Sequence, residues 1–495
     1  MITFENQLKK LKYLVLKEVA KMTLENRLNK EELERMPFEI INGDRAEYRC
    51  CVYKERAIVY ERAKLAMGCL PNGQIAEELV NVEDEDQIVY VIDAACDKCP
   101  INRFVVTEAC RGCIQHKCVE VCPAGAITRA AGRAYINHET CKECGLCKEV
   151  CPYNAVAEVM RPCKRVCPTG ALKMNPDDNK AEIKKEDCIN CGACMSACPF
   201  GAISDKSFVV DIIRDIMDKK KVYAIVAPAI AGQFGPEVKV GQIKEALKKI
   251  GFTDMIEVAC GADAVSVHEG NELIERLESG DKFMTSSCCP GFLSYIEKKF
   301  PDLVDKISGT VSPMVATGRM IKKMDEDAMI VFVGPCTAKK NEVKRASIKD
   351  AVDYVMTFEE ITALMGAYDI WPSECEGVET NDASVFGRGF AQGGGLTLAV
   401  QNYVKGLGTN IELKPVRASG SDEVKRTMIM AKVGRLSGNF IEGMMCEGGC
   451  IGGPATMAPM AKVKSQLAKF CKESDKKDVI ANDMLEKFEG VNLER

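Results

Sequence analysis

The sequence lacks several features that would place it in a common class. No apolar run reaches the roughly 18 residues that a membrane-spanning helix needs. No long basic run is present and the formal net charge is −5, which argues against nucleic acid as a main partner. The first residues also lack a basic segment followed by an apolar core, so no secretory signal is expected.

Cysteine, by contrast, is abundant, with 27 among 495 residues. The number is odd, and most of the cysteines stand in Cys-x-x-Cys runs that end in proline. A disulfide framework would require export, so metal-bound thiolates in a reducing cytoplasm are the better interpretation. The composition therefore predicts a cytoplasmic protein without a membrane or nucleic-acid partner, and the length predicts two to four domains.

Residues 1–90 are expected to form a small, mainly helical module. Apolar side chains, with lysines between them, recur there at helical spacing at Leu11, Val15, Val19 and Met22. The module also holds three cysteines without a cluster pattern, namely Cys50, Cys51 and Cys69. We interpret these three as small buried hydrophobic residues, and an additional metal site is the alternative.

Residues 91–205 are predicted to form an α+β polyferredoxin region. Two tetrads have the bacterial spacing Cys-x2-Cys-x2-Cys-x3-Cys-Pro, one beginning at Cys141 and one at Cys188. The 16 cysteines of the region suffice for four [4Fe-4S] cubanes, since each cubane takes four. They are Cys96, Cys99, Cys110, Cys113, Cys118, Cys122, Cys141, Cys144, Cys147, Cys151, Cys163, Cys167, Cys188, Cys191, Cys194 and Cys198.

The order of these cysteines predicts two ferredoxin units, one nested inside the other. In two-cluster ferredoxins the fourth cysteine of each run binds the other cluster. For the inner unit, this rule groups Cys110, Cys113 and Cys118 with Cys151, and Cys141, Cys144 and Cys147 with Cys122. For the outer unit, it groups Cys188, Cys191 and Cys194 with Cys167, and Cys96, Cys99 and Cys163 with Cys198. Zinc knuckles, the alternative, would leave the Cys-Pro ends unexplained.

After Cys198 the pattern changes to α/β. Short apolar runs, typical of buried parallel strands, predict strands at residues 222–227, 255–259 and 328–333. An amphipathic segment at residues 242–250 is expected to be one of the helices that cover the sheet.

Five further cysteines stand in three short segments: Thr285-Ser-Ser-Cys-Cys-Pro-Gly291, Gly334-Pro-Cys-Thr-Ala-Lys-Lys340 and Met444-Met-Cys-Glu-Gly-Gly-Cys450. Thiolates are soft ligands that suit iron, and glycine lets the backbone approach a metal closely. One more cubane is therefore predicted on Cys289, Cys336, Cys446 and Cys450. The Cys288 thiol is left over beside it.

In order and content, the three segments resemble the signatures of the [FeFe]-hydrogenase catalytic domain, from about residue 221 onward. The resemblance implies a two-lobed α/β catalytic domain over residues 206–495. It also implies an H-cluster, in which a cubane is joined through Cys450 to a diiron subsite with CO, cyanide and azadithiolate. Cys288 would then be a free thiol that exchanges protons with the subsite. An exchange of roles between Cys288 and Cys289 is the alternative.

The same resemblance implies a proton relay from the free thiol to the surface. The relay residues are predicted in the order Cys288, Glu272, Ser308, Glu269 and Arg276. The two glutamates stand three residues apart, on one face of a predicted helix. A solvated, charged helix is the alternative interpretation of this segment.

Four further residues match positions beside the subsite: Lys339, Glu342, Met444 and Phe390. Lys339 matches the lysine that hydrogen-bonds a cyanide, a charge-assisted contact. Two positions depart from the prototype, which has Met at Gly334 and in many members Ser at Ala229. These departures are expected to alter the reduction potential of the site and its catalytic bias rather than the type of reaction. The pattern looks like the group B branch of the [FeFe]-hydrogenase family.

Together, the residues and the resemblance predict a ferredoxin-dependent [FeFe]-hydrogenase of the ferredoxin-fused type, with the reaction 2 H⁺ + 2 e⁻ ⇌ H₂. Four accessory cubanes would conduct electrons between an external ferredoxin and the H-cluster, and dedicated maturases would supply the diiron subsite. One rival is a non-catalytic relative, either an assembly factor or an H₂ sensor. A pure electron-transfer polyferredoxin would leave the three later cysteine segments unexplained.

Overall fold

The computed structural model describes residues 4–73, 87–97, 99–409 and 411–495. Among these residues, no helix is both long enough and apolar enough to cross a membrane.

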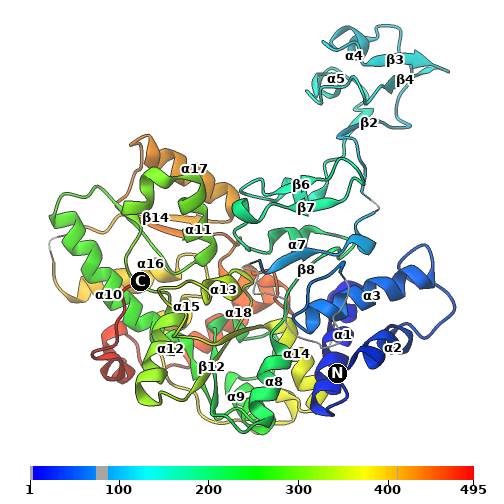
Figure 1. Cartoon of the computed structure of the whole chain (residues 1–495). Coiled ribbons are helices and arrows are strands. Elements are labelled where there is room, and N and C mark those ends of the chain that lie inside the picture. The colour runs from blue at the N-terminus through cyan, green and yellow to red at the C-terminus, as the bar shows by residue number, and fades with distance from the viewer. Residues whose placement is uncertain (1–3, 74–86, 98, 410) are drawn as a thin grey trace.

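The N-terminal module consists of three helices: α1 (Gln7–Leu24), α2 (Lys30–Ile40) and α3 (Val52–Ala66). Asn6 and Asn29 cap the first two, because each side chain accepts a hydrogen bond from a backbone N–H of the first turn. The predicted apolar stripe of α1 is core, and Val15, Val19 and Met22 are fully buried. This face packs against two helices of the rest of the chain, α8 (Val209–Met217) and α14 (Phe358–Tyr368) (Figure 1).

The expectation that all three cysteines of this module are buried is wrong for two of them. Cys69 is buried, whereas Cys50 and Cys51 are exposed. The exposed pair ends the loop before α3, where Cys51 is the N-cap residue. Both cysteines precede the first buried residue of the helix, Val52.

The ferredoxin region folds as two small units of antiparallel strand pairs and short helices. The outer unit contains β1 (Val89–Val91) with β8 (Ile203–Asp205), β6 (Leu172–Met174) with β7 (Ala181–Ile183), α6 (Pro162–Arg165) and α7 (Ala193–Ala197). The inner unit contains β2 (Phe104–Val106) with β5 (Val156–Glu158), β3 (Ile127–Ala130) with β4 (Arg133–Ile136), α4 (Lys117–Glu120) and α5 (Leu146–Glu149). Strand β1 begins two residues inside the predicted helical module. In Figure 1 the inner unit projects away from the rest of the molecule.

The remainder of the chain contains two parallel sheets. The first has the order β10 (Asp254–Glu257), β9 (Val222–Val226), β12 (Met329–Gly334) and β13 (Tyr354–Thr357). The second has the order β11 (Met284–Thr285), β15 (Phe440–Met444) and β14 (Pro415–Ser419). The strand predicted at residues 255–259 ends earlier, because the chain enters a helix at Val258.

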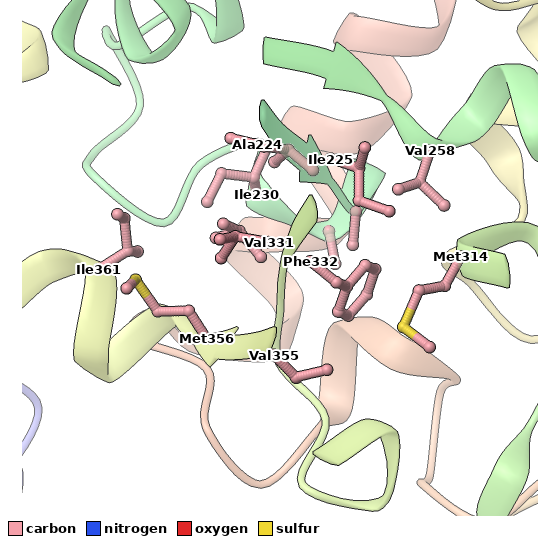
Figure 2. Close-up of a cluster of buried hydrophobic side chains, with 14 of the residues drawn as sticks. Ala224, Ile225, Ile230, Val258, Met314, Val331, Phe332, Val355, Met356 and Ile361 are labelled. Atoms are coloured by element: carbon pink, nitrogen blue, oxygen red, sulfur yellow. The ribbon is translucent and has the colours of Figure 1, made fainter. Parts of the chain in front are cut away.

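Helices surround the sheets. Besides α8 and α14 they are α9 (Val240–Ile250), α10 (Val258–Glu278), α11 (Pro290–Lys299), α12 (Pro313–Met324), α13 (Ala338–Glu342), α15 (Val385–Gly389), α16 (Gly395–Gly406), α17 (Ser421–Lys432) and α18 (Met460–Lys472). Figure 2 shows the core around β9 and β12, where Ala224, Ile225 and Val331 are fully buried. Parallel strands covered on both faces are apolar throughout, which is why the sequence predicted them.

Buried ion pairs join the three regions. The fully buried Lys340 Nζ lies 2.7 Å from an Asp205 oxygen at the end of β8 and 2.8 Å from a Glu360 oxygen of α14. In α1, Lys12 Nζ lies 3.0 Å from a Glu359 oxygen, one residue earlier in α14. Removal of one partner of such a pair leaves an uncompensated buried charge, so these contacts hold the outer ferredoxin unit and α1 in place.

Candidate active site and cysteine groups

Each of the three later cysteine segments follows the carboxyl end of a parallel strand. Cys288 and Cys289 come after β11, Cys336 after β12, and Cys446 after β15. Ligand sites of α/β proteins lie at this edge of the sheet, where loops from different strands meet. Here the strand ends of both sheets meet, and five thiols from distant parts of the chain line one cavity: Cys288, Cys289, Cys336, Cys446 and Cys450.

The chemistry of this donor set fits an iron–sulfur cluster. Burial, together with the neighbouring thiols, raises the pKa of the Cys336 thiol to about 11 and that of Cys450 to about 12. Cys450 lines the cavity and is the one exposed cysteine of the five. Without iron these sulfurs would remain protonated, whereas a cationic iron core displaces such protons. The rest of the wall is largely apolar, and Lys339 is the only charged residue among the described residues that line it.

Gly449 allows the third segment to turn tightly between Cys446 and Cys450. Its φ is +87°, and a Cβ there would lie 2.6 Å from the Gly393 backbone nitrogen and 2.9 Å from Met444 Sδ. Only glycine adopts this conformation in so little space. The glycine run at residues 393–395 packs closely against this turn.

Lys339 extends from α13 to the cavity and pairs with Glu342 of the same helix. Its Nζ donates a 2.6 Å hydrogen bond to Glu342 Oε2, and both side chains are buried. Burial acts to lower the pKa of the lysine, but the Glu342 carboxylate and the nearby thiols raise it above its usual value. The ammonium is therefore charged where it faces the cavity.

Glu269 lies beside the Cys288 thiol at the inner end of a line of polar groups. It is 0% exposed, and burial followed by the Glu272 charge raises its pKa to about 8. Ser308 and the backbone N–H of Ser287 face the carboxyl group, yet neither oxygen makes a hydrogen bond of ordinary geometry within the described chain. Burial raises the pKa of the Cys288 thiol well above its usual value, and the Glu269 charge adds to this shift.

Glu272 continues the line toward the surface. Its Oε2 accepts hydrogen bonds from Ser308 Oγ at 2.6 Å and Thr310 Oγ1 at 3.1 Å, and its Oε1 accepts one from the Gly309 N–H at 2.8 Å. Arg276 Nη2 lies 2.7 Å from Oε1, and its side chain is 24% exposed. Burial acts to raise the pKa of Glu272, but these donors and the guanidinium lower it.

The predicted order of the relay is therefore wrong in one respect. Glu269, not Glu272, adjoins Cys288, and Glu272, not Glu269, pairs with Arg276. Glu272 and Arg276 lie one turn apart on α10, so their side chains meet, whereas Glu269 lies almost a turn deeper. Sequence reasoning also missed Thr310.

Glu442 is a second acid near Cys288 that sequence reasoning missed. It accepts hydrogen bonds from the backbone N–H groups of Gly394 (2.6 Å) and Thr397 (2.8 Å) and from the Thr397 hydroxyl. Burial raises its pKa. The signal in the sequence that could have identified it is an acidic residue inside an otherwise apolar strand segment, residues 440–444.

Three predicted cofactor contacts, Glu342, Ala229 and Gly334, do not line the cavity, whereas Lys339, Phe390 and Met444 do. Ala229 is buried behind it, and its carbonyl accepts a 2.8 Å hydrogen bond from Gln233 Nε2. A Cβ at Gly334 would lie 2.5 Å from Cε1 of Phe332, whose ring lines the cavity instead. The absence of a side chain at position 334 thus makes room for the Phe332 ring.

Most of the ferredoxin cysteines have neighbours from the set in which the sequence placed them. In the outer unit Cys163 has Cys198, Cys99 and Cys96 as neighbours, and Cys167 lies near Cys188, Cys191 and Cys194. In the inner unit Cys122, Cys141, Cys144 and Cys147 line one small cavity, and Cys118 lies near Cys113 and Cys151. Cys110 packs against the small core of the same unit. Several sulfurs accept backbone N–H bonds, as cluster ligands do, including Cys96 Sγ from Ala181 at 3.3 Å.

One of these sets borders the active-site cavity. The Cys191 thiol is a neighbour of Cys336 and Cys446. The adjacent loop is held by a 2.7 Å hydrogen bond from Thr337 Oγ1 to the Asn190 carbonyl. A Cβ at Gly192 would lie 2.7 Å from that hydroxyl oxygen, so glycine permits the close approach of the two thiol sets.

Glu269 gives a prediction for the effect of pH. With a pKa of about 8 it should carry a proton at pH 7 and lose it as the pH rises through 8. Between about pH 4.3 and 8 the native state binds one proton more than the unfolded state at this group. The free energy of unfolding therefore falls as the pH rises, with a limiting slope of about 1.4 kcal/mol per pH unit. Difference infrared spectra should show a protonated carboxyl band at pH 7 that is absent in Glu269→Gln. A wild-type spectrum without that band would contradict the assignment, and Glu272→Gln is the control that should retain it.

Comparison with known proteins gives matches along most of the chain. Residues 220–454 match the family "Iron only hydrogenase large subunit, C-terminal domain", residues 157–209 match an LdpA Fe-S cluster-binding domain, and residues 109–155 match a 4Fe-4S dicluster domain. Iron hydrogenase 1 of Clostridium pasteurianum is 27% identical over 436 residues, which cover 76% of this chain and 75% of that protein.

Two further comparisons concern an assembly factor and a solved structure. The cytosolic Fe-S cluster assembly factor NAR1 of Kluyveromyces lactis is 33% identical over 98 residues, which cover 20% of this chain and 21% of that protein. The solved structure of a variant of the [FeFe]-hydrogenase HydA1 from Chlamydomonas reinhardtii has a TM-score of 0.50 and 21% identity. It covers 58% of this chain and 95% of that chain, and shows a shared fold.

Proposed function

Since residues 220–454 form a domain of the iron-only hydrogenase family, we propose that the protein is an [FeFe]-hydrogenase that catalyses 2 H⁺ + 2 e⁻ ⇌ H₂. One observation carries the proposal beyond family membership. Cys288 is a fifth thiol at a site where four suffice for a cubane, and it stands beside the buried acid Glu269. A cluster that only holds structure or passes electrons has no use for such a proton carrier.

In this proposal Cys289, Cys336, Cys446 and Cys450 would hold the H-cluster. The bound cluster supplies the metal centre at which protons and electrons combine. Lys339 directs its ammonium group toward a cyanide of the subsite, held in place by Glu342. Apolar side chains of Phe332, Phe390 and Met444 restrict water at the site.

Protons travel between the cavity and the surface by way of Cys288, Glu269, Ser308, Glu272 and Arg276. The thiol and Glu269 keep their protons at neutral pH because both are buried, so a proton is always available at the inner end. Glu272 is ionised because Arg276, Ser308 and the Gly309 N–H stabilise its charge. Glu269 is thus a proton donor on the inside and Glu272 a proton acceptor nearer the surface. The Ser308 hydroxyl lies between them, so the relay works in either direction.

Electrons reach the site through the cysteine sets of the ferredoxin region. The inner unit projects outward, which favours it as the place where an external ferredoxin docks (Figure 1). A cluster on the set that contains Cys191 would supply electrons to the active site, because Cys191 lies beside Cys336. Dedicated maturases would supply the diiron subsite.

A non-catalytic role, in H₂ sensing or cluster assembly, is the second candidate. It is favoured by the local likeness to the assembly factor NAR1. The buried line from Cys288 to Arg276 argues for turnover, because assembly does not require a proton path.

The deciding experiment is an infrared spectrum of matured protein together with an H₂ assay. We expect CO and cyanide bands, and H₂ evolution with reduced ferredoxin as donor. Loaded protein with these bands but no turnover would identify a sensor or assembly protein instead. Fully matured protein without the bands would overturn the H-cluster.

Cluster number gives a separate prediction. Reconstituted protein that lacks the diiron subsite should contain about twenty irons, since five cubanes hold four irons each. Cys163→Ser should lower this content by about four and remove one cluster signal from the electron paramagnetic resonance spectrum, because Cys163 lies among Cys96, Cys99 and Cys198. The exposed Cys50→Ser is the matched control and should change nothing. About twelve irons in the wild-type protein would mean that the outer unit binds no clusters.

A further inference from the structure

A cavity of about 150 Å³ lies where the N-terminal module meets the outer ferredoxin unit. We call it the N-terminal cavity. Its walls come from α1, α3, the loop that joins α2 to α3, and the Pro199–Phe200 segment. Apolar side chains line much of it, among them Leu11, Ile58 and Val59. In another protein an engineered cavity of about this volume binds benzene, so a small molecule fits here.

Three polar atoms at this cavity have no hydrogen-bond partner among the described residues: Arg49 Nε, Glu55 Oε2 and Arg62 Nε. Nine such buried atoms occur in the described part of the chain, so a third of them gather at one place. Glu55 and Arg62 are each only 4% exposed. Buried polar atoms are nearly always paired, so this concentration indicates a polar ligand.

The remaining atoms of these three groups are engaged, which keeps the three from pairing with one another. Glu55 Oε1 accepts the backbone N–H of Arg49 at 2.8 Å. Arg62 Nη2 donates to the Gly201 carbonyl at 2.6 Å. Arg49 Nη2 donates to the Ala95 carbonyl at 2.9 Å and also pairs with the Asp97 carboxylate. Each side chain is thus held by its neighbours and presents one unpaired polar atom.

The unpaired atoms define the ligand by their chemistry. Two guanidinium N–H groups require acceptors, which a carboxylate supplies with its two oxygens. The Glu55 oxygen requires a donor, which an ammonium or hydroxyl group supplies. We infer that the N-terminal cavity binds a small carboxylic acid that also carries an amino or hydroxyl group.

Such a ligand would act on the outer ferredoxin unit. Arg62 lies near the Cys198 thiol. Gly201 contacts both helices, since a Cβ there would lie 2.2 Å from Leu8 Cδ1 of α1 and 3.1 Å from Arg62 Nη2 of α3. A carboxylate bound at Arg62 offsets part of the positive charge near the cluster that we propose on Cys198. Binding should therefore lower the reduction potential of that cluster. This consequence depends on the proposed cluster, whereas the binding itself does not.

Equilibrium dialysis of the full-length, reconstituted protein with labelled glycine and labelled glycolate tests the inference. At least one should bind at a single site, and acetate, which lacks the donor, should bind about tenfold more weakly. Glu55→Gln and Arg62→Gln should each weaken binding by about tenfold or more. Glu34→Gln and Arg35→Gln, exposed positions on α2, are matched controls that should leave binding unchanged.

A further variant guards against loss of the fold. Ile41→Phe adds bulk at the cavity wall and changes no charge, so it should abolish binding while iron content stays at the wild-type value. A preference for glycine or for glycolate identifies the donor as ammonium or hydroxyl. If neither probe binds, or if Glu55→Gln, Arg62→Gln and Ile41→Phe all bind as wild type, the cavity holds water only and the inference is overturned. Bound probe should also shift the potential of one cluster, and Cys163→Ser should remove that shift without removing binding.

Discussion

Cys288→Ala is expected to leave every cluster in place and to lower H₂ turnover by at least about hundredfold. Four other thiols line the same cavity, so the loss of Cys288 removes no ligand that the cubane needs. It does remove the group that lies between Glu269 and the cavity, and no other described titratable group takes that place. Iron content, infrared bands and H₂ evolution measured on one preparation separate these two effects.

Two companion variants make this result specific. Cys288→Asp should recover part of the turnover, because a carboxyl group also accepts and donates protons. Cys289→Ala should lose the active-site cubane itself. The ligand and relay roles would be exchanged if Cys288→Ala lost the cubane while Cys289→Ala kept it. Full turnover in both variants would refute the mechanism.

Lys339→Ala is expected to lose the diiron subsite while the cubane remains. The variant removes the one described charge that faces the cavity, and a charge-assisted hydrogen bond of this kind contributes about 1.5–3 kcal/mol. It also leaves Glu342 as a buried carboxylate without its partner at 2.6 Å, which costs several kcal/mol of stability, about 3–5 for a fully buried pair. Weaker CO and cyanide bands at unchanged cubane iron are the expected observation.

A double variant distinguishes these two contributions. Lys339→Ala combined with Glu342→Gln removes the unpaired charge, so stability should recover while subsite retention should not. Lys349→Ala, an exposed lysine beyond the same helix, is the control and should resemble the wild type. Normal bands and occupancy in Lys339→Ala would mean that Lys339 does not contact the subsite.

The sequence by itself determined the content of the site. Cysteine ligands of one cluster lie a few residues apart, so their number and spacing can be counted along the chain, and the structure gathers Cys163 with the partners that this count implied. The buried face of α1 could also be predicted from local sequence, because helical periodicity alone places Val15, Val19 and Met22 on one face.

Only the tertiary structure decided the direction of the relay, the wall of the cavity and the N-terminal cavity. Spacing placed Glu269 and Glu272 on one helix face, but which of them meets Cys288 depends on how α10 packs against the strand ends. In the same way, the Phe332 ring occupies the space left by Gly334, and Glu55 and Arg62 come to face a ferredoxin loop more than a hundred residues away. Local pattern sets which side chains share a turn, whereas contacts between distant elements are set by packing, which no single segment encodes.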